Sequence, residues 1–388
     1  MPSARKKPND ISLNDLFPAG GRVLLTASGT EFIQRIGIDA TRQVILNVLM
    51  GENIRKQTEP LTRRRIAQIS GAMVVLFARG LQQSNRFTDD LSAIAARQLT
   101  TAKKDKASTW LAQWAIGLTG KSVQNVLRSD SRELTAYIAD FEQAVADAAA
   151  KCRRENGELT MTLGFAEDGK GRRVELDWED ITRLTTAIGS LTLTIRGSEK
   201  ATYGKLFERL ILGSVLSILG FDHVERATNT RTKRVFWLAD SSDTRESDAT
   251  LLLQPGKLAR FDIGFIGRGN SEISKDKLTR YAREIEMGGQ IHASHTFVVV
   301  DRLPDTSKTR QSADQIGAEI VQMSMQYWPR DLAQRLEKRV GHRHPLAQMP
   351  DSKIGTYLHA RLATIPIENF LAGFKPELFD DTSTSDEE

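Results

Sequence analysis

Residues 248–267 read DATLLLQPGKLARFDIGFIG and combine two strand-like runs with a reverse turn. Apolar and β-branched residues fill both runs, as expected for strands of a buried sheet. In the QPGK turn, proline presets φ and glycine accepts a positive φ, so the segment predicts an antiparallel hairpin. Folding about this turn pairs residues whose numbers sum to 511, which sets Asp248 opposite Ile263 and beside Asp262.

Asp262 is unusual in the second run, because aspartate is disfavoured in strands. Its neighbours Phe261, Ile263 and Phe265 alternate onto one face, which leaves Asp262 and Gly264 on the other. A carboxylate buried in such a strand costs free energy unless it is paired or bound to a metal ion. Asp262 is therefore a candidate functional residue, although a structural ion pair would account for it as well.

Helix and strand patterns alternate around this hairpin. A helical pattern over residues 203–219 ends at Gly220, a residue type common just after helices. Strand patterns cover residues 233–238, 248–253, 259–267 and 296–301, with a helical pattern over 276–287 before the last. This succession predicts an α/β fold, in which a mixed central sheet is flanked by helices. Helical patterns return over residues 312–327 and 331–340.

The pattern of apolar and polar residues changes along the chain and predicts three regions. Residues 1–155 show helical periodicity and are expected to form a mainly helical N-terminal region. Residues 156–345 begin with a hairpin-like pattern and are expected to form an α/β core. Residues 346–388 form a C-terminal segment with an acidic tail.

Composition narrows the class of protein. Hydrophobic residues make up 40% of the 388 residues and charged residues 27%, as in ordinary globular proteins. No apolar run is long enough to cross a membrane, the N-terminus does not resemble a secretory signal, and Cys152 is the single cysteine. We therefore expect a cytoplasmic protein without disulfides or membrane contact.

The distribution of charge favours a polyanionic partner. The net charge is +5, but residues 380–388 contain five acidic and no basic residues, so the rest of the chain carries +10. Basic surfaces bind nucleic acids through the release of counterions. The cluster Arg63, Arg64 and Arg65 precedes a helical pattern over 66–81, where positive charge opposes the helix dipole, so we expect it to contact DNA.

Further charged residues could join Asp262. Glu208 lies at the flank of the apolar stripe of the preceding helical pattern. After the second strand run, the glycine-rich stretch of residues 267–277 supplies Glu272, Lys275 and Lys277. A third strand would place Lys275 opposite Asp262, whereas a helix beginning by residue 274 would place Lys277 in its first turn. Carboxylates that hold Mg²⁺, together with a lysine, suit phosphodiester hydrolysis.

Two stretches carry a resemblance to a known family. TYGKLFE (202–208) and RFDIGFIGRGNSEISKDK (260–277), with the elements around them, resemble the CfrBI-type type II restriction endonucleases of the PD-(D/E)xK nuclease superfamily. The resemblance implies Mg²⁺-dependent cleavage of double-stranded DNA at a short palindromic site, leaving a 5′-phosphate, in the restriction of foreign DNA. It also implies a homodimer and a cognate DNA methyltransferase that protects host sites. On this resemblance, residues 156–345 are the endonuclease catalytic core and residues 1–155 serve DNA recognition or dimerisation.

The chain departs from the superfamily pattern at the lysine. Neither Asp262 nor Glu272 has a lysine two residues later. The central carboxylates are either Asp262 with Glu272, which we prefer, or Asp262 with Asp248. Lys277 is preferred to Lys275 as the lysine, unless that role is filled differently.

The expected site therefore combines several candidates. Expected metal ligands are Asp262, Glu272 and Asp248. The loop residues Arg268 and Asn270 are expected to contact DNA.

Two other classes of function fit these residues. One is a non-catalytic DNA-binding or regulatory protein, in which Asp262 belongs to a structural polar cluster. The other is a different metal-dependent nuclease on the same core, acting in repair or on RNA. Asp262→Ala should keep DNA binding and lose Mg²⁺-dependent cutting in a nuclease, whereas a pure DNA-binding protein has no cutting to lose. Discrete fragments from plasmid DNA, rather than smears, would distinguish a restriction enzyme from a general nuclease.

Overall fold

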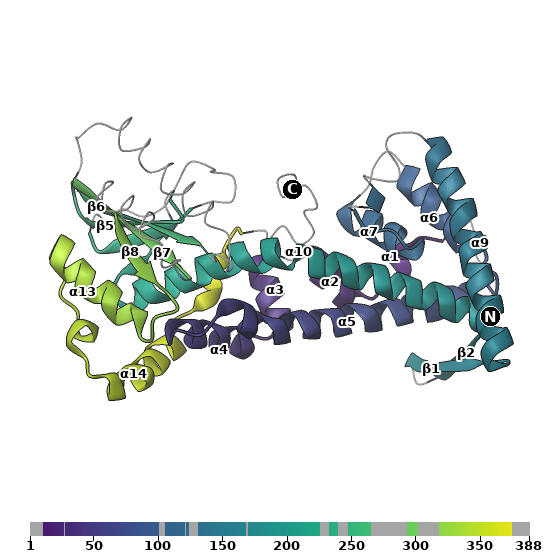
Figure 1. Cartoon of the computed structure of the whole chain (residues 1–388), viewed down its shortest axis with the longest axis horizontal. Coiled ribbons are helices and arrows are strands. Elements are labelled where there is room, and N and C mark those ends of the chain that lie inside the picture. Colours follow the sequence, from purple (N-terminus) through teal and green to yellow (C-terminus); the bar gives the residue numbers. More distant parts are fainter. Residues whose placement is uncertain are drawn as a thin grey trace. The chain divides into compact units, whose positions relative to one another are not determined.

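The computed structural model follows the order of elements labelled in Figure 1. The structure describes residues 11–26, 28–100, 105–120, 122–123, 131–167, 170–225, 233–239, 247–264, 293–301 and 318–374. The chain divides into two compact units, and each is assembled from separate stretches of sequence. Unit 1 comprises residues 1–27, 62–200 and 377–388, and unit 2 comprises residues 28–61 and 201–376.

The boundaries of these units differ from the boundaries expected from the residue patterns of the sequence, which lie at residues 155/156 and 345/346. Residues 28–61 belong to the same unit as the sheet, because their helices form hydrogen bonds with segments that follow the sheet in the sequence. The indole Nε1 of Trp328 donates a 2.8 Å hydrogen bond to the carbonyl of Val48. The guanidinium of Arg42 donates to the carbonyls of Ala363 and Ile365. Both contacts join residues about 300 positions apart in sequence, which composition does not reveal.

Unit 1 is mainly helical. Its helices are α1 (Leu13–Leu16), α2 (Ala19–Thr26), α6 (Leu91–Thr100), α7 (Lys106–Ala115), α9 (Ser131–Asn156) and parts of α5 (Ile54–Gln83) and α10 (Trp178–Ile218). The predicted hairpin is present, with β1 (Met161–Glu167) antiparallel to β2 (Lys170–Leu176). A charged cluster is built into this unit, where the nearly buried Arg183 donates hydrogen bonds to Glu142 and Glu179.

Unit 2 contains the mixed sheet and the helices around it. Its helices are α3 (Gly29–Ile36), α4 (Ile38–Leu49), α13 (Trp328–Val340), α14 (Asp351–Ala363), the 3₁₀ turns η2 (Pro345–Gln348) and η3 (Ile367–Leu371), the start of α5 and the end of α10. Its strands are β3 (Asp222–His223), β4 (Val235–Leu238), β5 (Ala249–Gln254), β6 (Lys257–Gly264), β7 (Ala293–Val300) and β8 (Glu319–Gln322). The α/β fold class expected from the sequence is therefore confirmed.

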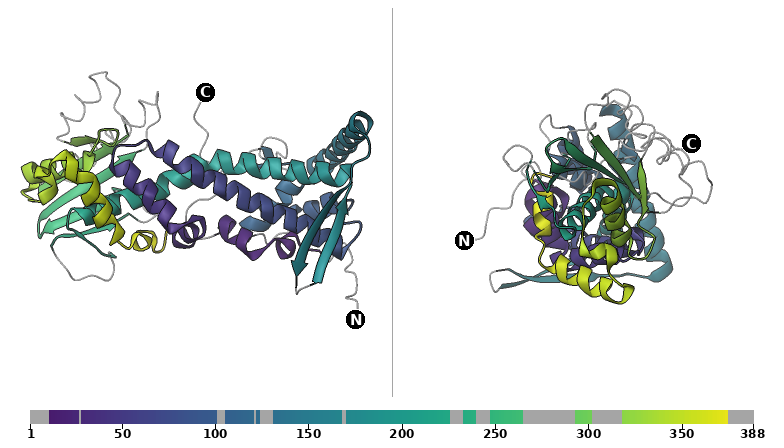
Figure 2. Two further views of the ribbon diagram at one scale, coloured as in Figure 1. Left: turned by 90° about the horizontal axis from the view of Figure 1, so that it is seen from below. Right: turned by 90° about the vertical axis from the view of Figure 1, so that its left-hand side faces the viewer.

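The sheet has six strands in the spatial order β3-β4-β5-β6-β7-β8. Strands β4, β5 and β6 form an antiparallel meander, and β6, β7 and β8 are parallel to one another. The core of the sheet is apolar, and the rings of Phe261 and Phe297 stack at 5.0 Å across β6 and β7. The end of α10 lies along the sheet in each view (Figures 1 and 2).

Two helix predictions are wrong in part. The helical pattern over 312–327 contains β8, because Val321 and Met323 are buried in alternation and the segment pairs with β7. Residues 312–317 lie outside the described part of the chain. The cluster of Arg63, Arg64 and Arg65 lies within α5 rather than before a helix, since α5 begins at Ile54 and continues through Pro60.

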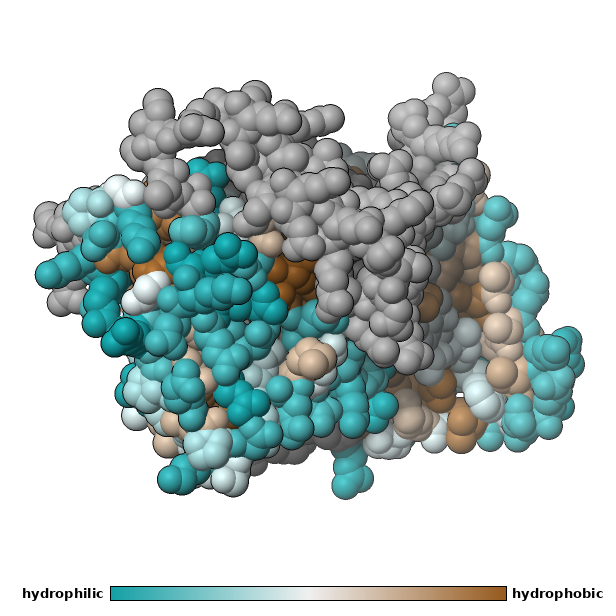
Figure 3. All heavy atoms as spheres, turned by 60° about the vertical axis from the view of Figure 1, so that its left-hand side comes forward, coloured by the Kyte–Doolittle hydropathy of each residue, from teal (hydrophilic) through white to brown (hydrophobic). Residues whose placement is uncertain are grey.

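Among the described helices, none is both long and apolar enough to cross a bilayer. The coloured part of the face shown in Figure 3 is mostly hydrophilic, with smaller apolar patches.

Candidate active site at the carboxyl edge of the sheet

One edge of the sheet collects the ends of several strands. The parallel strands β6, β7 and β8 end there, at Gly264, Val300 and Gln322. Strand β4 ends and β5 begins at the same edge, because Leu238 pairs with Ala249 and Ala249 pairs with Phe261. We call this the carboxyl edge. Side chains from sequence-distant segments meet at such an edge, as in other α/β proteins.

Asp248 and Asp262 lie next to each other at the carboxyl edge. Asp248 directly precedes β5, and its Oδ2 accepts a 2.8 Å hydrogen bond from the backbone N–H of Ile263. The expected proximity of the two aspartates is therefore present. The expected register is wrong by one residue over most of the hairpin, because an irregularity between Leu252 and Gln254 shifts the pairing.

The environment of Asp262 makes a full negative charge costly. Its exposure is 3%, and the flanking Phe261 and Ile263 are fully buried. A buried carboxylate is stable when hydrogen bonds or a cation balance its charge. Asp248, half-buried at the same place, adds a second carboxylate. Two such groups supply hard oxygen ligands, so the pair fits a divalent cation of the Mg²⁺ type.

Glu208 lies on α10, in the turn that contacts the carboxyl edge. Its neighbour Arg209 donates hydrogen bonds to the carbonyl of Ala239, just after β4, and to the carbonyl of Phe370. Glu208 is half-buried. The structure thus anchors this turn of α10 at the end of β4, as expected for a helix that contributes to the site.

Several predicted site residues lie outside the described residues. They are Arg268, Asn270, Glu272, Lys275 and Lys277, which follow the end of β6 along the chain. Their roles stay predictions. Within the part of the chain that the structure describes, no three His, Cys, Asp or Glu side chains come together to hold a metal ion.

The predicted basic cluster is split by burial. Arg63 and Arg64 are exposed on α5, whereas Arg65 is fully buried and its Nη2 donates to the carbonyl of Leu24. The predicted DNA contact of Arg65 is thus contradicted. Consecutive helical residues point in directions about 100° apart, so Arg65 can face the buried side of α5 while Arg63 and Arg64 face solvent.

Asp301 was not recognised as a site residue from the sequence. It follows the last residue of β7, and its backbone N–H donates a 3.3 Å hydrogen bond to the carbonyl of Gly264 at the end of β6. The signal that could have found it is the run TFVVVD, in which a carboxylate follows four consecutive apolar residues at the end of a strand.

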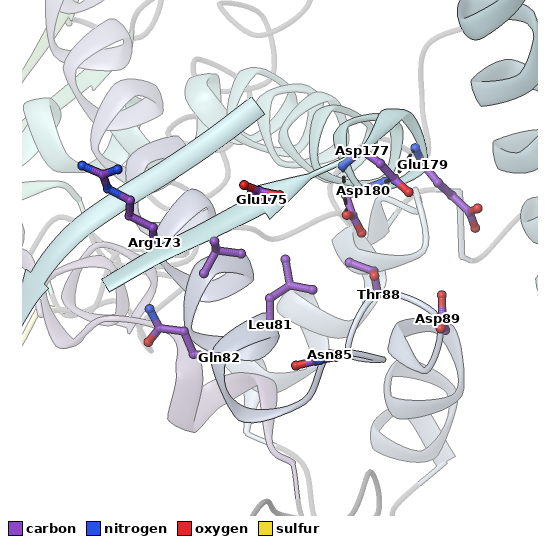
Figure 4. Close-up of a pocket in the computed structure, with 11 residues that line it drawn as sticks. Leu81, Gln82, Asn85, Thr88, Asp89, Arg173, Glu175, Asp177, Glu179 and Asp180 are labelled. Atoms are coloured by element: carbon purple, nitrogen blue, oxygen red, sulfur yellow. Dashed lines mark hydrogen bonds between the residues drawn. The ribbon is translucent and has the colours of Figure 1, made fainter. Parts of the chain in front are cut away.

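A separate pocket lies in unit 1 (Figure 4). Its volume is about 460 Å³, and its lining includes five carboxylates and a single arginine, Arg173. Asp177 and Asp180 accept hydrogen bonds from each other's backbone N–H groups, which caps the start of α10. Burial raises the pKa of Asp180. An acidic lining repels phosphates, so this pocket does not suit a nucleic-acid substrate.

Fold and site together define a class. A helix, an antiparallel three-stranded meander, a parallel strand and paired carboxylates at the sheet edge are the features of a PD-(D/E)xK nuclease core.

Comparison with known proteins identifies the family. The model of the CfrBI restriction endonuclease family matches residues 38–308, which include Glu208, Asp248 and Asp262. The type II restriction enzyme CfrBI of Citrobacter freundii is 32% identical over 356 residues, covering 92% of this chain and 97% of that enzyme. No solved structure matches significantly. The chain belongs to the CfrBI restriction endonuclease family, and it is a site-specific DNA endonuclease rather than a non-catalytic DNA-binding protein.

Proposed function

We propose that this protein is a type II restriction endonuclease that hydrolyses phosphodiester bonds of double-stranded DNA at a short palindromic site, with Mg²⁺ as cofactor. The observation that carries the proposal is the burial of Asp262 beside Asp248 at the carboxyl edge. Family membership supplies the reaction class. The pair of carboxylates supplies the ligands that such a reaction needs.

In this mechanism, Asp248 and Asp262 would hold the cation with their carboxylate oxygens. When bound, Mg²⁺ polarises the scissile phosphate and lowers the pKa of the attacking water. The hydrogen bond from Ile263 N–H orients Asp248 toward that task. Glu272 and Glu208 are further candidate carboxylates, and Lys277 or Lys275 would stabilise negative charge that develops on the phosphate. The proposed products carry a 5′-phosphate.

The palindromic site favours a homodimer, since each subunit of a two-fold dimer presents one site to one strand. Arg268 and Asn270 are proposed to read bases, and the exposed Arg63 and Arg64 to contact phosphates. A cognate methyltransferase would protect host DNA. Because the enzyme would act on foreign DNA that enters the cell and would share that compartment with the protected host DNA, we place it in the cytoplasm.

The test is cleavage of unmethylated plasmid DNA with and without Mg²⁺, followed by sequencing of the ends. We expect discrete fragments with one sequence at every end, only when Mg²⁺ is present. The variant Asp262→Asn should lower the cleavage rate by about 100-fold or more and should still bind DNA. Asp39→Asn, which changes an exposed aspartate on α4, is the matched control and should cut normally. Smeared products, or full activity of Asp262→Asn, would contradict the proposal.

A further inference from the structure

Asp301 joins three segments at the carboxyl edge. Its N–H donates to the carbonyl of Gly264 at 3.3 Å, and its own carbonyl accepts a 2.9 Å hydrogen bond from the N–H of Ser324, in the turn between β8 and α13. Its Oδ2 accepts a 3.1 Å hydrogen bond from Nδ2 of Asn53, which precedes α5. One residue therefore links the end of β6, the β8–α13 turn and the start of α5.

The Asp301 carboxylate also has a cationic neighbour. Burial raises the pKa of Asp301, and the charge of Arg55 acts in the opposite direction. Arg55 lies in the first turn of α5 and is exposed. The positive charge of Arg55 thus lies close to a residue that is bonded to the end of the strand carrying Asp262.

Asn53 couples Asp301 to the start of α5. Its Oδ1 accepts hydrogen bonds from the N–H groups of Arg55 at 2.9 Å and Lys56 at 3.4 Å, while its Nδ2 donates to Asp301. A single amide side chain therefore caps the helix and attaches it to the carboxyl edge. The orientation of the Arg55 backbone follows directly from this pair of contacts.

The turn before α5 is fixed from a second side. A Cβ atom on Gly51 would lie 3.0 Å from Cα of Gln326 and 3.0 Å from the carbonyl of Met325, and Gly51 has a φ of 100°. The α4–α5 turn thus packs directly on the β8–α13 turn, which Asp301 also bonds through Ser324. The place of Arg55 is set by contacts within unit 2.

We propose that Asp301 is a positioning residue for DNA cleavage, which acts through Asn53 to hold Arg55 at the carboxyl edge, where the guanidinium contacts a backbone phosphate of the bound DNA. The inference rests on the proposed function, because the carboxyl edge must be the place where the scissile strand lies. Arginine forms charge-assisted, often bidentate hydrogen bonds with phosphate oxygens. Such a contact fixes the register of DNA without reading its sequence.

The first test measures DNA binding of Arg55→Gln in EDTA, where no cleavage occurs, as a function of salt. Labelled duplexes with and without the mapped cleavage site serve as probes. We expect binding to both duplexes to weaken by a similar factor of about 3–10, and the slope of log K against log salt to fall by about 1. Arg343→Gln is the matched control, because Arg343 is an exposed arginine that pairs with Glu337 of α13. The end of α13 lies at the other end of the strands, where the carbonyl of Val340 accepts a hydrogen bond from Lys257, the first residue of β6.

The second test separates positioning from general loosening. Asp301→Ala removes the acceptor for Asn53, whereas Asp301→Asn keeps an oxygen there. We expect Asp301→Ala to weaken binding by about the same factor as Arg55→Gln and to lower cleavage at subsaturating enzyme in proportion, and Asp301→Asn to restore most of the affinity. In the double variant Asp301→Ala/Arg55→Gln, the two losses should not add, because both act on the same phosphate contact.

Three results would overturn the inference: an unchanged salt slope in Arg55→Gln, equal losses in Arg343→Gln, or additive losses in the double variant. If Asp301→Ala does not fold, the Arg55→Gln result decides alone, because Arg55 is a surface residue. Failure of the proposed function is distinguishable, since it would appear as Mg²⁺-dependent cleavage by Asp262→Asn, whatever the DNA affinity of the Arg55 variant.

Discussion

The carboxylate of Asp248 has two kinds of neighbour. One is the backbone N–H of Ile263, which donates to Oδ2. The other is Asp262, the buried residue that directly precedes Ile263 in the adjacent strand. The hydrogen bond stabilises the fold, whereas in the proposed mechanism the two carboxylates together bind the cation. Because the two contacts use different properties of the side chain, substitutions can separate them.

We expect both Asp248→Asn and Asp248→Ala to reduce Mg²⁺-dependent cleavage by about 100-fold or more, since each removes a negative ligand. Only Asp248→Ala also removes the acceptor for Ile263 N–H, and it should lower the free energy of unfolding by about 1 kcal/mol relative to Asp248→Asn. Urea unfolding and plasmid cleavage of the two variants check this. Equal stability of both would show that the hydrogen bond contributes nothing measurable.

At the scale of elements, α10 is one helix of 41 residues, which begins well before the helical pattern predicted over residues 203–219. The stretch just before that pattern contains glycine and β-branched residues, which weaken a helical pattern. The helix continues because Leu191, Ile195 and Ser198 are buried on one face, at spacings of four and three residues. Tertiary burial thus overrides local propensity.

The glycines of α10 give a paired prediction. A Cβ on Gly213 would lie 2.6 Å from the ring of Phe370, whereas a Cβ on Gly204 would meet nothing within 4 Å. We expect Gly213→Ala to destabilise unit 2 by about 1–3 kcal/mol through overpacking. Gly204→Ala should stabilise it by about 0.5–1 kcal/mol, because alanine loses less backbone entropy in a helix. Urea denaturation of both variants tests the pair, and the same sign of change in both would contradict it.

At the scale of the whole molecule, two half-buried histidines of unit 2 pack between distant segments of the chain in their neutral form. Burial, with a contribution from Arg209, lowers the pKa of His223 to about 4, and its ring lies against Phe236 and Phe370. Burial also lowers the pKa of His344 to about 4. These residues join segments before, within and after the sheet, so their protonation affects the stability of the whole unit.

Stability should therefore fall as the pH drops from about 6.5 to about 4. In this range the unfolded chain binds protons at His223 and His344 while the folded chain does not, so each contributes a slope of at most about 1.4 kcal/mol per pH unit. The variant His223→Phe keeps an aromatic ring and loses the titrating group. We expect its urea midpoint to change less between pH 7 and pH 5 than that of the unaltered protein, and an equal change would refute the assignment.

The sequence alone determined the features that depend on near neighbours. The QPGK turn, the pairing of β5 with β6, the proximity of Asp248 to Asp262 and the end of α10 near Gly220 follow from turn chemistry and periodicity. These signals act over a few residues, because they reflect allowed backbone angles and the face that each side chain presents.

Tertiary structure decided the rest. Only the folded chain showed that β8 is a strand, that Arg65 is buried, and that Asp301 is bonded to Asn53 across 248 positions of sequence. Periodicity indicates that a face will be buried but does not name the partner that buries it. Long-range partners are selected by packing and hydrogen bonding in the assembled unit, which is why the link between Asp301 and the start of α5 is absent from any local pattern.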